Sequence, residues 1–356
     1  MNKTLTKDYR GHTIYVGLDV HKKSWKVSVL SAHSHFKTFS QNPSPAELAT
    51  YLHRNFPGAT FKACYESGFS GYWAQRELKD LGIDCMVVNP ADVPVTDYEK
   101  SKKSDAIDST KLGRSLRNNE LRPIYIPSPE EQMDRDLVRY RRKLVRDQTR
   151  CKNRIKSFLH FHGIAIPKHL DNHHWSKRFI EWLKSKSLSH ESGTTVLLEL
   201  LDNLLYLRVK VLKVTKEVRE LSKKAPYQSR VALLLTVPGI GVVSAMTLLT
   251  ELINLKRFKR LDDLCSFIGL VPDVYASGET HITKNLTHRS NSSIRGIIIE
   301  SSWVAIRKDP ALLLKFNELS NRMSKNKAII RIAKKIIRRV KYVLDNEQSY
   351  ELSVVE

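Results

Sequence analysis

The first third of the chain alternates short apolar runs with segments of helical periodicity. Three runs, beginning at residues 13, 25 and 35, follow one another closely and predict a meander of three strands. Two later runs, at 61–65 and 85–88, are separated by a helical segment and predict further strands. The predicted order is three strands, helix, strand, helix, strand, helix, which is typical of an α/β domain. We place this domain at residues 1–128.

Polar residues mark where two of these helices begin. Ser44, followed by proline, and Glu47 predict a helix with a closed capping box. Ser104 is the expected cap of a later helix that opens on Asp105 and Asp108. These two acids are three residues apart, so they share a face of that helix.

The middle of the chain, residues 129–228, carries two apolar seams of roughly heptad spacing. Their members are Met133, Leu137, Tyr140, Leu144, Cys151 and Phe158 in the first, and Leu197, Leu201, Leu204, Val211 and Val218 in the second. Polar residues interrupt both seams. This pattern predicts two long helices in a coiled-coil segment, either as an antiparallel hairpin or as a dimer contact.

The C-terminal part, residues 229–356, is predicted to be mostly α-helical. Its stretch from 231 to 250 contains no charge and is long enough to cross a membrane, but Pro238, Gly239 and Gly241 interrupt it. Two short buried helices joined by a turn explain this pattern better. The turn resembles a helix-hairpin-helix element, whose glycines let a backbone approach a phosphate. A purely structural turn between two buried helices is the close alternative. Residues 325–343 form a basic amphipathic helix.

Charge points to the class of partner. The formal net charge is +23 and the pI is near 9.8, which favours a polyanion, with nucleic acid as the default. Arg142 and Arg146, on the basic face of the first long helix, are candidates for phosphate contacts. The four cysteines form no CxxC pair, and the start of the chain is not a signal peptide. We therefore expect a cytoplasmic protein with no membrane partner.

Four carboxylates are candidates for one site. Asp19 ends the first apolar strand and Glu66 ends the fourth, while Asp105 and Asp108 open the last helix of the domain. Each has an ordinary alternative role, as a turn residue or as an acid that stabilises a helix N-terminus. Together they supply the oxygen ligands that a pair of divalent cations needs. Mg²⁺ is the expected cofactor, with Mn²⁺ as a substitute.

Three short motifs resemble the DEDD family of insertion-sequence transposases, which includes the Piv-like DNA invertases. They are Gly17-Leu18-Asp19-Val20-His21-Lys22, Tyr65-Glu66-Ser67-Gly68 and Lys103-Ser104-Asp105-Ala106-Ile107-Asp108. The resemblance implies an RNase H-like (RuvC-like) fold for the N-terminal domain and a metal role for the four acids. His21 and Lys22 are then DNA-binding or metal-shell residues, unless they form only a polar turn.

The block from Gly269 to Gly278 resembles the C-terminal transposase domain of the same family. The resemblance implies that Ser277 is the nucleophile that joins covalently to DNA. Lys284, Arg289 and Arg295 are the nearest cations in sequence that could neutralise the phosphate. The chain departs from the family pattern after Lys284, where residues 285–291 contain no glycine.

The resemblance implies a bacterial, nucleoid-associated recombinase that acts on donor and target DNA. It further implies guidance by a structured bridge RNA and assembly as a homodimer or tetramer. Two alternatives remain open. A Holliday-junction resolvase would use metal-activated water and would not need Ser277, and a non-catalytic nucleic-acid-binding protein would need none of the four acids.

Overall fold

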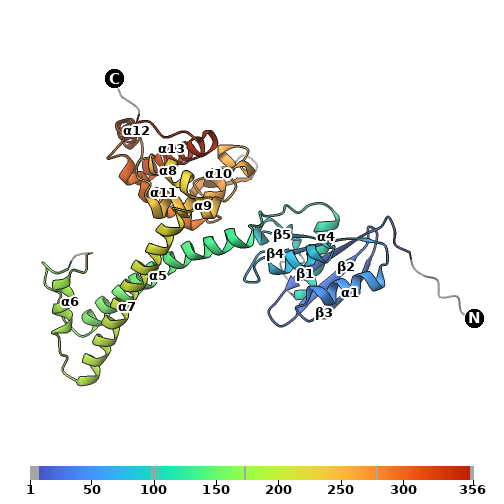
Figure 1. Ribbon diagram of the computed structural model, residues 1–356, viewed down its shortest axis with the longest axis horizontal. Helices are drawn as coiled ribbons and strands as arrows, with labels where there is room; N and C mark the ends of the chain where they lie inside the picture. The colour runs from blue at the N-terminus through green and yellow to red at the C-terminus, as the bar shows by residue number, and fades with distance from the viewer. Residues whose placement is uncertain are drawn as a thin grey trace, which may run out of the picture. The chain divides into compact units, whose positions relative to one another are not determined.

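The computed structural model describes residues 8–97, 99, 102, 104–171, 174–277 and 280–352, with the backbone alone at 274–277 and 280–284. The chain divides into two compact units, Met1–Ile126 and Pro127–Glu356 (Figure 1). The division of the chain into domains at residues 1–128, 129–228 and 229–356 stays a prediction.

The first unit is built on a five-stranded sheet of order β3-β2-β1-β4-β5. The strands are β1 Thr13–Val20, β2 Trp25–Leu30, β3 His35–Gln41, β4 Thr60–Glu66 and β5 Asp84–Val88. The first three are antiparallel neighbours, and β4 and β5 run parallel to β1. The helices are α1 Pro45–Asn55, α2 Trp73–Asp80 and α4 Asp105–Arg117, with a short turn η1 Pro90–Asp92. This arrangement confirms the predicted element order and is compatible with an RNase H-like DEDD domain.

Two glycines allow α4 to lie directly against the sheet. A Cβ on Gly17 of β1 would come within 2.0 Å of the Ser109 carbonyl oxygen, and one on Gly113 would meet the Leu30 side chain at 2.5 Å. Only residues without a side chain permit such a close approach. Helix α4 therefore lies closer to the sheet than it could if both contact positions carried side chains.

Hydroxyl groups fix α4 in its position along the sheet. The buried Ser28 Oγ on β2 lies 2.9 Å from Ser109 Oγ and 2.9 Å from Thr110 Oγ1. The predicted cap of this helix is confirmed, since Ser104 Oγ accepts a hydrogen bond from the Ile107 N–H at 3.3 Å. Together these contacts fix the position of the first turn of α4 relative to the sheet.

The capping box predicted for α1 is wrong in one detail. Ser44 Oγ does accept from the Glu47 N–H at 3.2 Å. The Glu47 carboxylate, however, accepts a hydrogen bond from Asn42 Nδ2 at 3.1 Å. A closed box forms instead at α5, between Ser128 and Glu131.

The second unit begins with a helical hairpin. Helices α5 Pro129–Phe161 and α7 Glu191–Leu221 pack along each other, with the short helix α6 Lys177–Lys184 between them in sequence. Arg141 Nε donates to Thr215 Oγ1 at 2.8 Å, and the Cys151 thiol donates to the Leu200 carbonyl at 3.3 Å. As the residue numbers of α5 increase, the residue numbers of their partners on α7 decrease. The two helices therefore run antiparallel, as predicted.

The heptad seam predicted for α5 is partly wrong. Met133 and Tyr140 are 69% and 49% exposed, whereas Val138 is buried. Val138 packs into the core formed by the C-terminal helices. The first half of α5 therefore buries a face that meets those helices together with Val218 of α7. The second half packs in a separate cluster with α6 and α7, so no continuous heptad seam forms.

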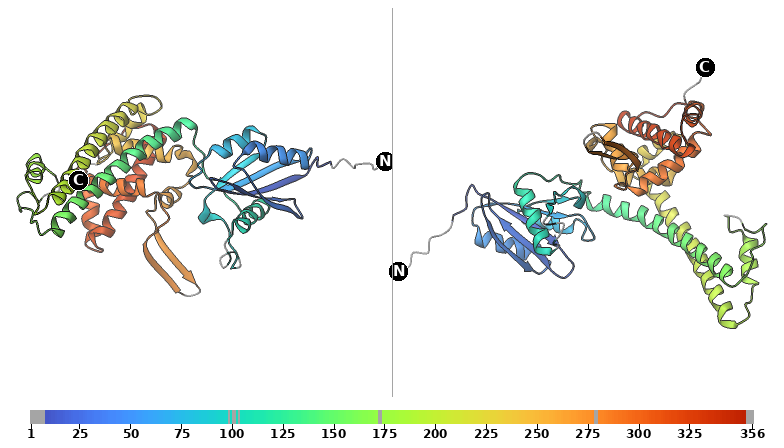
Figure 2. Two further views of the ribbon diagram at one scale, coloured as in Figure 1. Left: turned by 90° about the horizontal axis from the view of Figure 1, so that it is seen from below. Right: turned by 180° about the vertical axis from the view of Figure 1, so that it is seen from behind.

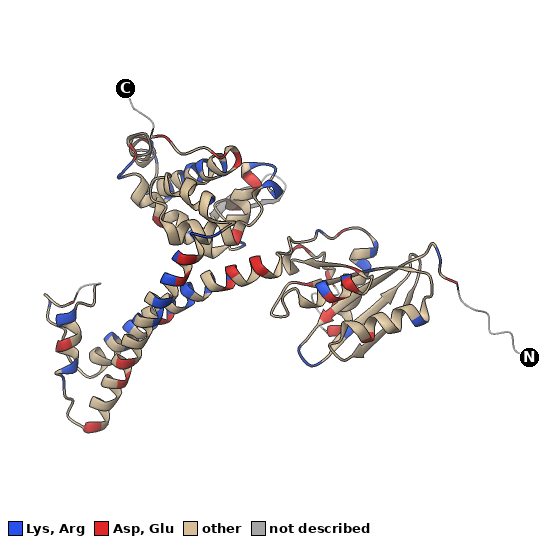
Figure 3. Ribbon diagram, in the orientation of Figure 1, with Lys and Arg blue, Asp and Glu red and all other residues tan. Residues whose placement is uncertain are grey.

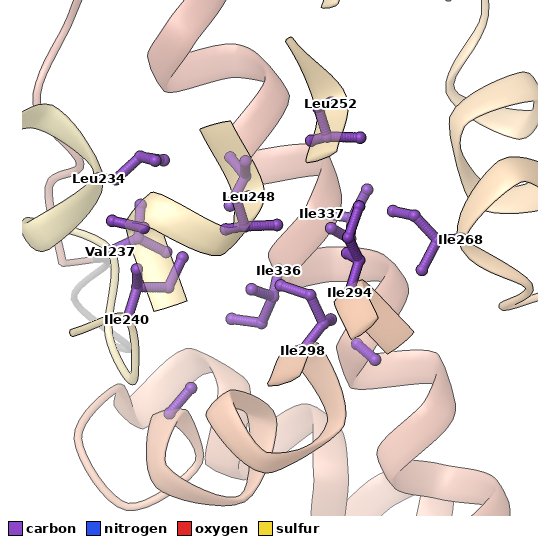
Figure 4. Close-up of a cluster of buried hydrophobic side chains, with 14 of the residues drawn as sticks. Leu234, Val237, Ile240, Leu248, Leu252, Ile268, Ile294, Ile298, Ile336 and Ile337 are labelled. Atoms are coloured by element: carbon purple, nitrogen blue, oxygen red, sulfur yellow. The ribbon is translucent and has the colours of Figure 1, made fainter. Parts of the chain in front are cut away.

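The remaining helices surround one apolar core. They are α8 Gln228–Leu235, α9 Val242–Leu252, α10 Leu261–Ile268, α11 Ser292–Ala305, α12 Pro310–Ser320 and α13 Lys325–Asn346, with a short turn η2 Leu255–Arg257. Figure 4 shows side chains from α8 to α13, among them Leu248, Ile298 and Ile336, converging on this core. The chain breaks between α8 and α9, as the proline and glycines predicted. Among the described residues, no helix is both long and apolar enough to cross a membrane.

A β-hairpin interrupts this helical region, which the sequence interpretation did not foresee. Strands β6 Pro272–Ser277 and β7 Thr280–Leu286 pair antiparallel and extend from the helices as a narrow ribbon (Figure 2). Val274, Tyr275, Ile282 and Thr283 are residue types that favour strands. Ser277 is thus the last residue of β6.

Candidate functional site

The ends of two neighbouring strands bring the first two acids together. Strands β1 and β4 are parallel, and Leu18 on one pairs with Tyr65 on the other. Asp19 and Glu66 are the next residue on each strand, so they lie side by side at the end of the strands. The sequence placed both acids at strand ends, and the strand order makes those strands neighbours.

The first turn of α4 brings the third acid to the same edge. Ligand atoms of Asp19, His21 and Asp105 all lie within 4.8 Å of one another. His21 Nε2 is 3.1 Å from Asp19 Oδ2. The structure thus joins one strand end, the turn that follows it and a helix start into one cluster. His21 is a member of this cluster.

Lys111, which the sequence analysis did not single out, contacts the other two acids, Glu66 and Asp108. Lys111 Nζ donates to Glu66 Oε1 at 3.3 Å and to Asp108 Oδ1 at 3.0 Å. Its side chain is only 9% exposed. The four carboxylates are therefore arranged as two pairs, Asp19 with Asp105 and Glu66 with Asp108. The signal available in the sequence was the three-residue spacing of Asp108 and Lys111, which puts both on one helix face.

Burial and neighbouring charges shift the ionisation of this group. Burial raises the pKa of Asp19 above its ordinary value, and the Asp105 and Asp108 carboxylates add to that rise, while His21 opposes it. Burial alone would lower the pKa of Lys111, but its contacts with Asp108 and Glu66 outweigh burial and raise it. Like charges held close together are thus a real cost of this site.

The donor set fits a hard divalent cation. Carboxylate oxygens are the ligands that Mg²⁺ and Mn²⁺ prefer in proteins, and several of them converge here. A cation would also offset the burial of the Asp19 carboxylate and the repulsion from Asp105 and Asp108, which together raise the pKa of Asp19. Asp19, Asp105 and His21 would be its nearest ligands, with Glu66 and Asp108 beside them.

The two arginines predicted on the basic face of α5 have different surroundings. Arg146 is exposed. Arg142 donates from Nη1 to Ser293 Oγ and from Nη2 to the Ser292 carbonyl at 3.0 Å. Burial lowers the pKa of Arg142, and the nearby charge of Arg146 lowers it further. Arg142 therefore ties α5 to the start of α11, and its contact with nucleic acid stays a prediction.

Packing explains one glycine of the predicted helix-hairpin-helix turn. Gly239 has φ of +83°, and a Cβ there would lie 2.1 Å from the Ser301 carbonyl oxygen of α11. Gly241 is the N-cap of α9, where no side chain caps the helix. The structural interpretation of the turn thus accounts for Gly239, while phosphate binding at Gly241 stays a prediction.

The other predicted DNA-binding residues are spread over both units. Lys22 is exposed in the turn after β1, and Arg289 is exposed after β7. Arg295 on α11 donates from Nη1 to the Thr287 carbonyl at 2.8 Å, with the Gly269 carbonyl at 3.5 Å. Those carbonyls precede and follow the β6–β7 hairpin, so Arg295 holds the two ends of the hairpin together. The side chains of Ser277 and Lys284 lie outside the described residues.

The sequence analysis also did not single out Glu251, a buried carboxylate in the second unit. Glu251 on α9 is 2% exposed and accepts hydrogen bonds from Arg139 at 2.7 and 2.8 Å and from Asn291 Nδ2 at 2.9 Å. Asn291 is the N-cap of α11. Glu251 thus joins α5, α9 and the start of α11, close to where the hairpin ends.

Comparison with known proteins agrees with this architecture. Residues 16–164 match a family model for the DEDD transposases of the IS110 type, and residues 231–318 match the model described as "Transposase IS116/IS110/IS902 family". The first match contains the four acids, and the second contains the β6–β7 hairpin. The two family models thus match the chain in the same order as the sequence motifs.

Individual relatives cover most of the chain. The protein y4qE of Sinorhizobium fredii is 28% identical over 67% of this chain, which spans 57% of that longer protein. The transposase for insertion sequence element IS1533 of Leptospira borgpetersenii is 28% identical, over 68% of this chain and 70% of its own length. The transposase for IS1111A of Coxiella burnetii is 24% identical, over 80% and 77%. Over most of its length the chain is therefore similar to insertion-sequence transposases of the IS110/IS116 family, and its N-terminal part matches their DEDD transposase domain.

Proposed function

We propose that this protein cuts and exchanges DNA strands during transposition of a mobile element. The observation that carries the proposal is the meeting of Asp19, Asp105 and His21 within 4.8 Å at the edge of the sheet. Four acids and one lysine at such an edge form a group that a divalent cation would stabilise. A bound divalent cation would neutralise the DNA phosphate and lower the pKa of an attacking oxygen.

The protein's own residues hold that site in shape. Asp19, Glu66, Asp105 and Asp108 would hold Mg²⁺ or, in its place, Mn²⁺. Lys111 keeps Glu66 and Asp108 from repelling each other and so preserves the arrangement before a cation arrives. The Ser28 contact with α4 keeps the helix acids over the strand ends.

The finer part of the proposal gives Ser277 the role of nucleophile. Its hydroxyl oxygen would attack a DNA phosphorus, forming a serine–phosphate ester. The bond from phosphorus to the departing deoxyribose oxygen would break, and that oxygen would take up a proton. Serine is almost wholly protonated at neutral pH, so it needs a base and a neutralised phosphate. The family resemblance of the 269–278 block supports this role, and the metal site of the same chain could meet both needs.

Assembly and guidance complete the proposal. The net charge of +23 suits binding of donor DNA, target DNA and a structured guide RNA. Figure 3 shows Lys and Arg distributed along α5 and α13 as well as in the first unit. Exposed apolar side chains on α7, including Tyr206, Val209 and Leu212, support a homodimer or a tetramer.

A covalent adduct assay tests the proposal. Purified protein is incubated with labelled element-end DNA, its RNA and Mg²⁺, then denatured and separated on a gel. We expect a protein–DNA adduct that disappears in Ser277→Ala and in Asp19→Asn, while Ser292→Ala, a nearby hydroxyl change, retains it. An adduct that persists in Ser277→Ala would place the nucleophile elsewhere.

Cleavage without any adduct would favour a different function. Water would then be the nucleophile, and the protein would act as a junction resolvase that uses the acid site alone. The acid site is the observation that supports this second candidate function. A protein that binds DNA but never cleaves it, with or without the acids, would contradict both.

A further inference from the structure

A basic groove runs between α13 and the base of the β6–β7 hairpin. It encloses about 1200 Å³ and lies wholly within the second unit. One wall is the exposed side of α13, with Lys327, Arg331 and Lys334, and the other includes Asn285 and Leu286 near the end of β7. The groove therefore begins where the hairpin leaves the helical core.

The three cations are on one side of α13 because the other side is buried. They are spaced by four and three residues, which places them on a common helix face. Ile329, Ile336 and Val340 on the opposite face are fully or almost fully buried in the core. Within the part of the chain that the structure describes, no acidic side chain forms an ion pair with any of the three. Their charge is thus available to a ligand in the groove.

The second wall is held rigidly. Arg295 lines the groove, but its Nη1 is already bonded to the Thr287 carbonyl at 2.8 Å. This bond fixes the loop that contains His288, which also lines the groove. Among the described lining residues Asp273 is the one carboxylate, so this lining carries an excess of positive charge.

We propose that this groove binds the phosphodiester backbone of a nucleic-acid strand and leads it to the hairpin. Three cations along one wall can contact successive phosphates of a strand, and such contacts fix the strand's position. The described lining contains no Phe, Tyr or Trp and one imidazole, His288, so it offers little surface for base stacking and favours the backbone over the bases. The claim that the strand is a transposition substrate rests on the proposed function, because β6 ends at Ser277.

Salt dependence of binding tests the groove. Fluorescence anisotropy with labelled oligonucleotides is measured at several salt concentrations for Lys327→Gln/Arg331→Gln/Lys334→Gln in the full chain. Each lost phosphate contact lowers the slope of log K against log salt by about 0.7 for single strands and about 0.9 for duplex DNA. We expect the slope to fall by roughly 2–3 in this variant.

The matched control removes three exposed cations of the same unit that do not line the groove. It carries Arg307→Gln, Lys308→Gln and Lys335→Gln. We expect its slope to stay near that of the wild type. An equal loss in both triple variants would overturn the proposal, because binding would then follow net charge and not the groove.

A footprinting experiment locates the strand. All four native cysteines are buried, so a thiol introduced by Asn326→Cys on the groove lining can be labelled selectively with a maleimide. We expect bound DNA or RNA to protect it, with Lys335→Cys outside the groove as the unprotected control. Separate arms with DNA and with RNA identify which backbone occupies the groove. No protection by either would overturn the proposal.

Binding and catalysis can be separated in these experiments. Ser277→Ala and Asp19→Asn leave the groove unchanged, so both should protect the introduced thiol as the wild type does. Loss of adduct formation with protection retained would support the groove whatever the nucleophile proves to be. Protection absent in a protein that still forms the adduct would sink the groove proposal alone.

Discussion

Lys111 Nζ lies 3.0 Å from Asp108 Oδ1, one turn back along α4, and the same ammonium reaches Glu66 on the sheet. A single internal cation thus pairs with the two acids that lie outside the Asp19–Asp105 pair. A divalent cation that uses all four carboxylates must compete with this lysine for Glu66 and Asp108. The first ion is therefore expected at the Asp19 side.

Replacing this lysine should reveal the competition. In Lys111→Met the acids lose their counterion, so the metal-free protein should lose about 1–3 kcal/mol of stability, because partly exposed acids cost less than a fully buried pair. Mn²⁺ should bind more tightly and in greater number. Calorimetric titration with Mn²⁺ and thermal unfolding in chelator measure both effects.

Lys111→Arg keeps the charge and serves as the control. It should remain closer to the wild type in metal-free stability than Lys111→Met. Weaker Mn²⁺ binding by Lys111→Met would contradict the competition and would instead make the lysine a support for the ligands.

Gly17 should be intolerant of any side chain. In Gly17→Ala the new methyl would lie 2.0 Å from the Ser109 carbonyl and 2.3 Å from the Gly113 nitrogen, so α4 must move away from β1. We expect a loss of about 1–3 kcal/mol from overpacking, together with weaker Mn²⁺ binding as Asp105 is displaced. Urea unfolding and metal titration test this. Gly68→Ala, which meets nothing within 4 Å, is the matched control.

The buried Glu251 should make stability depend on pH. Burial alone would raise its pKa, but the hydrogen bonds and charge of Arg139, with Asn291, lower it below the ordinary 4.5. A folded-state pKa below the unfolded value stabilises the fold above about pH 4.5, and that stability is lost as pH falls through the lowered pKa. Urea unfolding between pH 3 and pH 7 should therefore show a steeper acid loss in the wild type than in Glu251→Gln.

At neutral pH the same variant should be less stable by about 2 kcal/mol, since a charge-assisted hydrogen bond to Arg139 is lost. Glu300→Gln on α11 removes a carboxylate that forms no ion pair within the described residues, so it is a suitable control. An unchanged pH profile in Glu251→Gln would show that other acids govern the acid transition.

The exposed apolar face of α7 should carry a subunit contact. Tyr206, Val209 and Leu212 are 58%, 65% and 71% exposed and recur every three residues. Val209→Glu with Leu212→Glu should convert an assembly into monomers in light scattering while leaving thermal stability nearly unchanged. Leu313→Glu on α12 changes a 45% exposed apolar side chain elsewhere and should leave assembly intact.

These point changes are sharper than removing residues 131–224, which we also expect to leave a monomeric and inactive protein. Val138 and Val218 belong to the core shared with the C-terminal helices, so that deletion also removes part of the core. A dimer that survives the double substitution would place the contact on another surface.

Local patterns in the sequence determined much of this protein. Apolar runs ending in Asp19 and Glu66, the Ser104 cap, and the Pro238–Gly241 break each depend on residues close in sequence, and each appears as expected. The tertiary structure alone decided what meets across elements. It placed Lys111 between Glu66 and Asp108, turned Met133 and Tyr140 to solvent, and paired β6 with β7. Those outcomes depend on strand order and helix packing, which bring together residues that no local periodicity connects.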